Sequence, residues 1–382
     1  MKVISINCEN FRNLKELEVQ ADANINVIYG DNAQGKTNII EAINLFSGSK
    51  SFRGAKDKEQ INFDSNFCRL KLIFSDKDRE QQAEIKLLNS NINEKERTQI
   101  KRAITLNNVP IKSYNELLGN FYSIVFSPTH LSLIKDGPSG RRQFIDTAMC
   151  QINKRYCDYL TRYEKILKQR NALIKDIKKF ADLESTLDVW DTQLAKLGTI
   201  ITIYRNEYIA KLKKTAIKFY SGFSKGGEEL RVKYVSNTYE SVEKIEKYTD
   251  SNIKVYFDRL KESFSDDLGA GFTTVGIHRD DINFMVDQND VRIYGSQGQQ
   301  RSVVISVKLA EANILKEIIN EAPIVLLDDV LSELDLERQD YILNNLKDFQ
   351  VFITCCDPEN AMRLVKGKIL HIDGGALRNA DK

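Results

Sequence analysis

The apolar positions near the start of the chain predict three strands and then a helix. Three runs have the length and the β-branched content of strands: KVISINC (2–8), LKELEV (14–19) and INVIYG (25–30). The apolar residues of the next segment, 36–46, recur at helical spacing: Ile39, Ile40, Ile43 and Phe46. A buried strand, a short loop and a helix therefore follow one another over residues 25–46.

The next 60 residues alternate with period two and predict an antiparallel meander beside this first unit. Its strands would be FCRLKLIF (67–74), AEIKLL (83–88), AITLNNVPI (103–111, with an Asn-Asn turn) and FYSIVF (121–126). From about 140 to 265 the pattern is helical, with long apolar stripes that should pack against one another. Strands and a helix then follow: INFMV (282–286), VRIY (291–294), a helix at 302–320, IVLL (324–327), VFITC (351–355) and KILHI (368–372).

The loop between the third strand and its helix, GDNAQGKTN, fits the pattern G-x-x-x-x-G-K-[ST]. Backbone N–H groups of such a loop surround phosphates at the positive end of the helix. We predict that Lys36 reaches the β- and γ-phosphates and that the Thr37 hydroxyl holds Mg²⁺. The whole loop would bind nucleotide: Gly30, Asp31, Asn32, Ala33, Gln34, Gly35, Lys36, Thr37 and Asn38. The alternative is a glycine-rich turn around a lysine that binds no ligand.

A phosphate loop of this kind needs a carboxylate at the end of a neighbouring buried strand. The run IVLLDD ends in two carboxylates: Asp328 would serve the metal, and Asp329 would orient the attacking water as a base. The long separation of the two halves predicts an inserted lobe.

The segment YGSQGQQRS contains a turn that leads directly into an amphipathic helix. A helix N-terminus with a serine hydroxyl binds phosphate well. Since the loop at 30–38 already holds the phosphates within one chain, Ser296, Gly298 and Gln299 are predicted to act on the nucleotide of a second subunit, in an ATP-dependent homodimer.

These motifs together resemble those of the ABC-type ATPases of the SMC-like group, with SQGQQ as signature motif, IVLLDD as Walker B and SELD (332–335) as D-loop. Within that group the chain is similar to the RecF family of bacterial recombinational-repair proteins. The stretches that carry this similarity are NFRNL (10–14), GDNAQGKTNIIEAI (30–43), SFR (51–53), GPSGRRQFID (137–146) and GIHRDD (276–281).

The resemblance implies an α/β fold with an ABC-type ATPase head, a flanking antiparallel sheet and an inserted, mainly helical lobe. The expected parts are ATPase lobe I at 1–125 and 316–382 and lobe II, with the signature motif, at 126–315. Three features depart from the family pattern. Ile277 replaces the usual proline, the switch-histidine position falls among Cys355, Cys356 and Asp357, and no Q-loop glutamine is evident near 127–131.

The resemblance also implies a weak DNA-dependent ATPase that uses ATP and Mg²⁺, with Lys36 and Asp329 as catalytic residues. ATP-driven dimerisation would occur on gapped DNA, on single-strand/double-strand junctions or on double-stranded DNA. Slow hydrolysis would then release the DNA. The implied partners are RecR and RecO, which would help to load RecA. The alternatives are the nucleotide-binding subunit of a membrane transporter, which the inserted lobe disfavours, and a nuclease, for which a His/Asp metal cluster is missing from the sequence.

The composition adds few constraints, because 42% hydrophobic and 29% charged residues are ordinary for a globular protein. No apolar run has membrane length and the N-terminus lacks a signal-peptide core, so a cytoplasmic location without membrane contact is expected. The six cysteines include no C-x-x-C pair, which favours reduced, mostly buried thiols. The three histidines lie too far apart in sequence for a His/Cys zinc site.

The net charge is only +2, so DNA would have to meet local basic patches. Two clusters in the helical segment are candidates, with a solvated helix face as the alternative: Lys165, Lys168, Arg170, Lys175, Lys178 and Lys179, then Arg205, Lys211, Lys213, Lys214 and Lys218. We expect Arg141 and Arg142 to form a structural network with Asp280 and Asp281; the alternative is that they contact phosphate. Two further interpretations concern single residues. Arg53 would contact nucleotide or DNA, and His278 would be a buried histidine with satisfied hydrogen bonds, with a catalytic histidine as the alternative.

Overall fold

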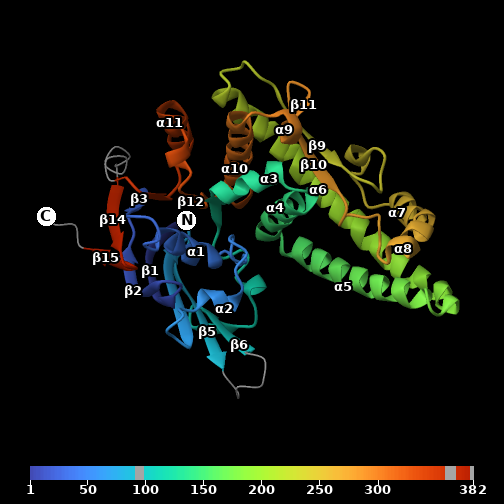
Figure 1. Ribbon diagram of the computed structural model, residues 1–382, viewed down its shortest axis with the longest axis horizontal. Helices are drawn as coiled ribbons and strands as arrows, with labels where there is room; N and C mark the ends of the chain where they lie inside the picture. Colours follow the sequence, from blue (N-terminus) through green and yellow to red (C-terminus); the bar gives the residue numbers. More distant parts are fainter. Residues whose placement is uncertain (91–98, 358–366, 379–382) are drawn as a thin grey trace. The chain divides into compact units, whose positions relative to one another are not determined.

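The computed structural model describes residues 1–90, 99–357 and 367–378 (Figure 1). The chain divides into two compact units. Unit 1 consists of residues 1–130 and 308–382, and unit 2 consists of residues 131–307. The boundary at 307/308 falls inside helix α10 (Gln297–Ile319).

The central sheet of unit 1 has the strand order β15-β14-β3-β13-β12-β8. Its strands pair in parallel, except that β15 pairs antiparallel with β14. Its strands are β3 (Ile25–Tyr29), β8 (Ser123–Phe126), β12 (Ile324–Asp328), β13 (Val351–Cys355), β14 (Gly367–Asp373) and β15 (Ala376–Arg378). Continuous apolar runs such as IVLL are typical of parallel strands that are buried on both faces. Strand β13 lies between β3 and β12, so the carboxyl ends of these three strands are adjacent.

The sequence predicts the strand at 121–126 in the antiparallel meander, and this prediction is wrong. Strand β8 pairs in parallel with β12 in the central sheet, and all four of its residues are buried. A short, mostly apolar run is compatible with either sheet, and its sequence does not identify its partner strand.

The second sheet of unit 1 is antiparallel, as expected for the flanking sheet, with the order β2-β1-β4-β5-β6-β7. Its strands are β1 (Lys2–Phe11), β2 (Leu14–Gln20), β4 (Phe67–Ser75), β5 (Glu80–Ser90), β6 (Gln99–Leu106) and β7 (Val109–Ile111). The predicted Asn-Asn turn is confirmed: Asn107 and Asn108 have φ values of 51° and 65° and connect β6 to β7. Helix α1 (Lys36–Leu45) shares one apolar core with residues of both sheets.

Unit 2 is mainly helical, as Figure 1 shows. Its helices are α3 (Ser132–Lys135), α4 (Pro138–Ile152), α5 (Lys154–Ile177), α6 (Leu187–Phe223), α7 (Asp250–Glu262), α8 (Phe264–Ala270), α9 (Val291–Tyr294) and the first part of α10. The two long helices α5 and α6 pack side by side (Figure 1). A small sheet has the order β11-β10-β9, with β9 (Leu230–Val235), β10 (Asp281–Val286) and β11 (Asn289–Asp290).

Three sequence predictions for unit 2 are corrected by the structure. Strand β9 interrupts the segment predicted to be wholly helical, and its alternating burial follows the strand period of two. The VRIY segment forms helix α9 instead of a strand, because the Asp290 side chain accepts a hydrogen bond from the Arg292 N–H and caps a helical turn. Helix α10 begins at Gln297 instead of 302.

Candidate functional site: the phosphate loop and the signature segment

The loop after β3 has a backbone that requires glycine at both ends of its motif. Gly30 and Gly35 have φ values of 151° and 109°, in the region that side chains disfavour. A Cβ on Gly30 would lie 2.1 Å from the backbone oxygen of Ile372 in β14. The predicted loop therefore matches the local geometry at both glycines.

Polar contacts from outside the loop hold its middle in place. Asn13 donates from Nδ2 to the Ala33 oxygen (3.0 Å) and accepts from Asn38 Nδ2 (2.7 Å). Gln34 accepts from the Gly374 N–H through its side-chain oxygen (2.6 Å). The loop is thus fixed at its turn and at the start of α1.

Lys36 is the first residue of α1, and its side chain curls under the loop with 8% relative exposure. The ammonium donates to the backbone oxygens of Gly30 (2.5 Å) and Asp31 (2.8 Å). It also lies 3.4 Å from the Cys356 sulfur. The first turn of α1 contains no acidic residue, and its N-cap residue is a glycine, so the helix itself supplies no side-chain anion to the positive end of its dipole.

Asp328 lies at the end of β12, where the sequence places the metal carboxylate. Its Oδ1 accepts from the Thr37 hydroxyl (2.8 Å) and from the Thr354 hydroxyl (3.1 Å). Burial raises the pKa of Asp328 above its usual range, although the two hydroxyl donors partly oppose this shift. Hydroxyl and carboxylate oxygens suit Mg²⁺, and a cation there would favour the ionised carboxylate. The donor chemistry therefore fits the predicted ion.

Asp329 leaves the strand in a left-handed conformation, with φ 54°. This conformation is uncommon for a residue other than glycine and costs of order 1 kcal/mol or more. The Asp329 N–H donates to Thr354 Oγ1 (2.9 Å), and its side-chain Oδ1 accepts from the Ser332 hydroxyl (2.8 Å). Asp329 is half-buried, and its carboxylate contacts the SELD segment through Ser332.

Sequence reasoning missed Thr354 at this edge of the sheet and assigned no role to Cys356. Thr354 bridges Asp328 and the Asp329 backbone from the end of β13. The exposed Cys356 donates to Asn32 Oδ1 (3.0 Å), and it is one of the three residues among which the usual switch-histidine position falls. The indication for both was the polar end of the buried VFIT strand. Arg53, for which the sequence leaves nucleotide and DNA open, donates to Asn38 Oδ1 (2.9 Å) beside α1.

The signature segment of unit 2 forms a helix cap. Ser296 Oγ accepts from the Gln299 N–H (3.2 Å), and Gln299 Oε1 accepts from the Ser296 N–H (2.9 Å). This reciprocal pattern is a capping box, and it explains why α10 begins at Gln297. Ser296 and Gln297 are exposed, and Gly298 is half-buried in the first turn.

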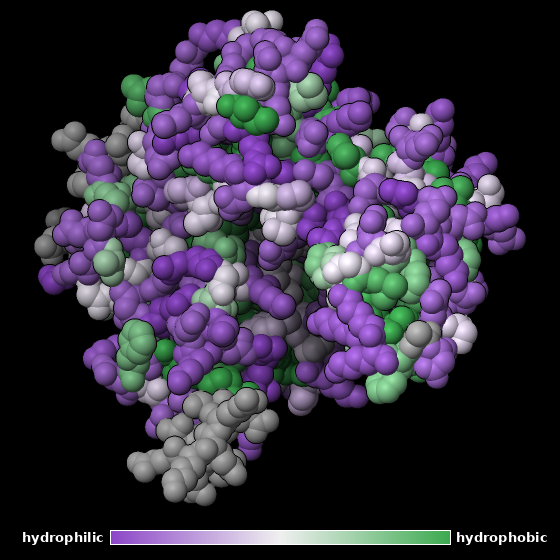
Figure 2. Space-filling model, turned by 45° about the vertical axis from the view of Figure 1, so that its right-hand side comes forward, coloured by the Kyte–Doolittle hydropathy of each residue, from purple (hydrophilic) through white to green (hydrophobic). Residues whose placement is uncertain are grey.

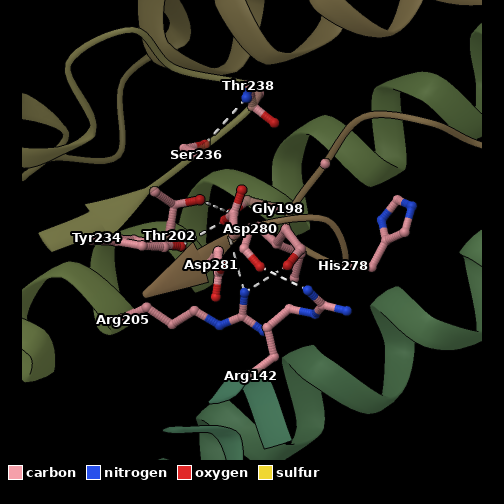
Figure 3. A network of polar contacts seen from close by, with 12 residues as sticks. Arg142, Gly198, Thr202, Arg205, Tyr234, Ser236, Thr238, His278, Asp280 and Asp281 are labelled. Carbon is pink, nitrogen blue, oxygen red and sulfur yellow. Dashed lines mark hydrogen bonds and ion pairs between the residues drawn. The ribbon is translucent and has the colours of Figure 1, made fainter. Parts of the chain in front are cut away.

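The two other stretches typical of the family, 137–146 and 276–281, join in one polar network in unit 2 (Figure 3). Arg141 binds both carboxylate oxygens of Asp281 (2.6 and 2.9 Å), and Arg142 donates to the backbone oxygen of Asp280 (2.7 Å). Burial raises the pKa of Asp280, which accepts from the Tyr234 hydroxyl (2.7 Å). The expected contacts of Arg141 and Arg142 with Asp280 and Asp281 are confirmed.

Two members of the predicted DNA-binding clusters are buried, which corrects their assignment. Arg170, 0% exposed, binds Asp191 and Asp267 at 2.5 Å each. Arg205, 3% exposed, binds Asp146 and the Ile277 backbone oxygen. The sequence does not distinguish a buried arginine from an exposed one at helical spacing. The lysines at 211, 213, 214 and 218 are exposed on α6.

His278 has a partner at each ring nitrogen, as expected: Nδ1 lies 2.9 Å from the Tyr163 hydroxyl and Nε2 lies 3.0 Å from the Thr273 oxygen. Burial lowers its pKa to about 4. The cysteines of the described segments are free: Cys8, Cys68 and Cys355 are buried, Cys150 and Cys157 are half-buried, and Cys356 is exposed.

Within residues 1–90, 99–357 and 367–378, no three His, Cys, Asp or Glu side chains gather into a metal-binding group, so a metal site here rests on Asp328 and its hydroxyl neighbours. No described helix has the length and apolar content needed to cross a membrane. The face seen in Figure 2 is mostly hydrophilic, with hydrophobic residues in small, separate groups.

Comparisons with known proteins agree with these motifs. The family model described as "RecF/RecN/SMC N terminal domain" matches residues 2–370. A "DNA replication and repair protein RecF" from Agathobacter rectalis is 41% identical over 385 residues, covering 100% of this chain and 100% of the relative. A protein of the same name from Lachnospira eligens is 37% identical over 383 residues, covering 99% of each.

Two solved structures extend the comparison to the fold. "Structure of the recombination mediator protein RecF-ATPrS in RecFOR pathway" is 36% identical with a TM-score of 0.89, covering 99% of this chain and 98% of that chain. A Smc head domain with an extended coiled coil from Pyrococcus furiosus is 14% identical with a TM-score of 0.56, covering 99% and 95%, and shows the fold alone. The fold is α/β: an ABC-type ATPase head with a flanking antiparallel sheet and an inserted, mainly helical lobe. The chain therefore belongs to the RecF family, within the RecF/RecN/SMC group.

Proposed function

We propose that this chain is an ATP-dependent DNA-binding protein of recombinational repair. The observation that carries the proposal is the assembly of Lys36, Thr37 and Asp328 at adjacent strand ends around an ordered phosphate loop. A solved relative that is 35% identical, with a TM-score of 0.88, is described as "RecF-ATP in RecFOR pathway", which supports ATP as the nucleotide. Unit 1 would act as the ATPase lobe, and unit 2 as the lobe that carries the signature motif.

The chemistry follows from the contacts in unit 1. Lys36 would exchange its bonds to the Gly30 and Asp31 carbonyls for β- and γ-phosphate oxygens, while the N–H groups of 30–38 surround the phosphates. Thr37 and Asp328 would hold Mg²⁺, which supplies positive charge to the phosphates. Asp329 would accept the proton of the attacking water. Aspartate has a shorter side chain than the usual glutamate, so turnover should fall below the roughly 10 s⁻¹ typical of enzymes.

The signature segment would act in a second copy of the chain. Within one chain the loop at 30–38 already provides the phosphate contacts, whereas Ser296 is exposed and keeps its hydroxyl proton available to donate, because its Oγ accepts from Gln299. We therefore propose ATP-driven homodimerisation, in which Ser296, Gly298 and Gln299 meet the partner's nucleotide. Slow hydrolysis would open the dimer.

The exposed lysines of α6 are the proposed DNA contacts, through the phosphate backbone and without base readout. Gapped or junction DNA as substrate, cooperation with RecR and RecO, and RecA loading are proposed from family membership, in keeping with the RecFOR pathway named for the solved relatives. A weak, DNA-dependent ATPase activity and a cytoplasmic location belong to the same proposal. Membership of the RecF family does not favour a transporter subunit.

The deciding experiment is light scattering after size-exclusion chromatography, with and without ATP. The parent chain should double its mass with ATP. Ser296→Arg should stay monomeric while fluorescence titration shows unchanged ATP binding, because residues 30–38 are intact. A Ser296→Arg chain that dimerises like the parent would exclude the trans role of this segment.

Asp329→Asn should give the opposite result in the same experiment. Asparagine keeps the shape of the side chain but cannot act as a base, so ATP should remain bound and the dimer should stay closed. Phosphate release is measured together with the mass from light scattering. Turnover at the parent rate would show that Asp329 is not the base.

A further inference from the structure

The amide of the signature residue Gln299 is held by a carboxylate that no sequence motif includes. Glu228 lies in the turn between α6 and β9, and its Oε1 accepts from Gln299 Nε2 at 2.9 Å. Its other oxygen, Oε2, accepts from the Tyr220 hydroxyl at the end of α6. We infer that Glu228 is a positioning residue for the signature motif, acting through Gln299; this inference rests on the proposed trans role of the motif.

The hydrogen bonds define which way the Gln299 amide must face. Since a carboxylate only accepts, the side of the amide toward Glu228 must be the NH₂ group, and the oxygen is left for the Ser296 N–H. The backbone N–H of Gln299 then donates to Ser296 Oγ. Without Glu228, the side-chain amide of Gln299 loses the charge-assisted hydrogen bond that fixes its orientation. The amide could then flip, which would turn its NH₂ group toward the Ser296 N–H and break the cap.

The orientation of the Gln299 amide affects nucleotide contact, because Ser296 and the first N–H groups of α10 are the donors proposed to bind the phosphates of the partner's nucleotide. The capping box keeps the first turn of α10 in place and leaves the Ser296 hydroxyl proton available. A loosened first turn would present the same donors in several arrangements, and ordering them would weaken association. Glu228 would therefore affect the dimer and not the binding of ATP to unit 1.

The chain provides a matched control next to Glu228. Glu229 is exposed, and its carboxylate pairs with Arg231 in the same strand region instead of with α10. Glu228→Ala and Glu229→Ala thus remove the same group at neighbouring positions. Glu228→Gln is the conservative variant, since its side-chain oxygen can still accept from Gln299 Nε2.

The experiment measures the ATP-induced dimer dissociation constant by light scattering, with monomer ATP affinity by titration and melting temperature alongside. Glu228→Ala should weaken the dimer about tenfold, in line with the loss of one hydrogen bond to a charged group. Glu228→Gln should restore dimerisation to near the parent value, and Glu229→Ala should match the parent. ATP affinity should be the same in all four proteins.

A double-mutant cycle separates positioning from a general loss of structure. If Glu228 acts through Gln299, the variant Glu228→Ala/Gln299→Ala should dimerise no worse than Gln299→Ala alone. Fully additive losses would overturn the inference, as would a Glu228→Ala dimer as tight as that of Glu229→Ala. Ser296→Arg tests the foundation independently: if it abolishes the dimer while Glu228→Ala has no effect, only the role of Glu228 fails.

Discussion

Two of the buried cations, Lys36 in unit 1 and Arg170 in unit 2, have different kinds of partner. Arg170 in unit 2 is bound by the carboxylates of Asp191 and Asp267. Lys36 in unit 1 is bound by backbone oxygens and a thiol, and among the described residues no carboxylate lies within ion-pair distance of it. A buried charge without a counter-ion is costly, so the charge of Lys36 is available to an anionic ligand. The charge of Arg170 is already neutralised, which indicates a framework role.

The largest effect on stability is expected for Arg170→Ala. The substitution leaves Asp191 and Asp267 buried without their partner and should reduce the free energy of unfolding by about 3–5 kcal/mol. Chemical denaturation of the full chain measures it. Arg162→Ala, an exposed arginine of the same helix, is the control and should change stability by less than about 0.5 kcal/mol. Equal stability of the two variants would contradict the framework role.

For Lys36→Ala the expected change appears in binding instead of stability. Losing the charge-assisted bonds to phosphate should weaken ATP binding about 100-fold, close to 2.7 kcal/mol. The unfolding free energy without nucleotide should not fall, because the variant removes a buried charge that is held by backbone oxygens. Fluorescence titration with ATP, with the exposed Lys50→Ala as control, tests this. Unchanged affinity would end the phosphate-loop assignment.

The difference between the two cations also explains what the sequence could predict. The phosphate loop and Asp328 can be identified from the sequence because glycine geometry and a buried strand end are local properties. The partners of Arg170 lie 21 and 97 residues away, so the sequence places it in a DNA-binding cluster. Thr354 escapes prediction for the same reason, since its role depends on β13 lying between β3 and β12. The capping box at Ser296 joins residues three positions apart and can be identified from the sequence. Its contact with Glu228 spans 71 residues and cannot.

The exposed lysines of α6 represent a third kind of cation, solvated on a helix face. Reversing Lys211, Lys213 and Lys214 to Glu should weaken DNA binding and flatten its salt dependence, by about 0.9 in the log-log slope for each phosphate that is no longer bound. Fluorescence anisotropy between low and moderate salt measures the slope. Reversal of three exposed lysines of unit 1, Lys58, Lys77 and Lys112, provides the control. A salt dependence identical to that of the parent would mean that the α6 lysines form a solvated helix face and do not bind DNA.

The smallest change in the unfolding free energy at neutral pH is expected for His278→Gln. His278 lies beside the arginine network of unit 2 (Figure 3). Burial lowers its pKa to about 4, below the usual histidine value of 6.5. Between these values the unfolded chain binds a proton that the folded chain excludes, so stability falls as the pH decreases from 6.5 toward 4 and is unaffected above that window. His278→Gln should therefore flatten the pH dependence of the unfolding free energy by about 1 kcal/mol per pH unit in this window. Denaturation curves at about pH 5, 6 and 7 measure the unfolding free energy of His278→Gln and of the parent. The same pH dependence in both proteins would mean that this histidine takes up its proton in the folded chain as it does in the unfolded chain.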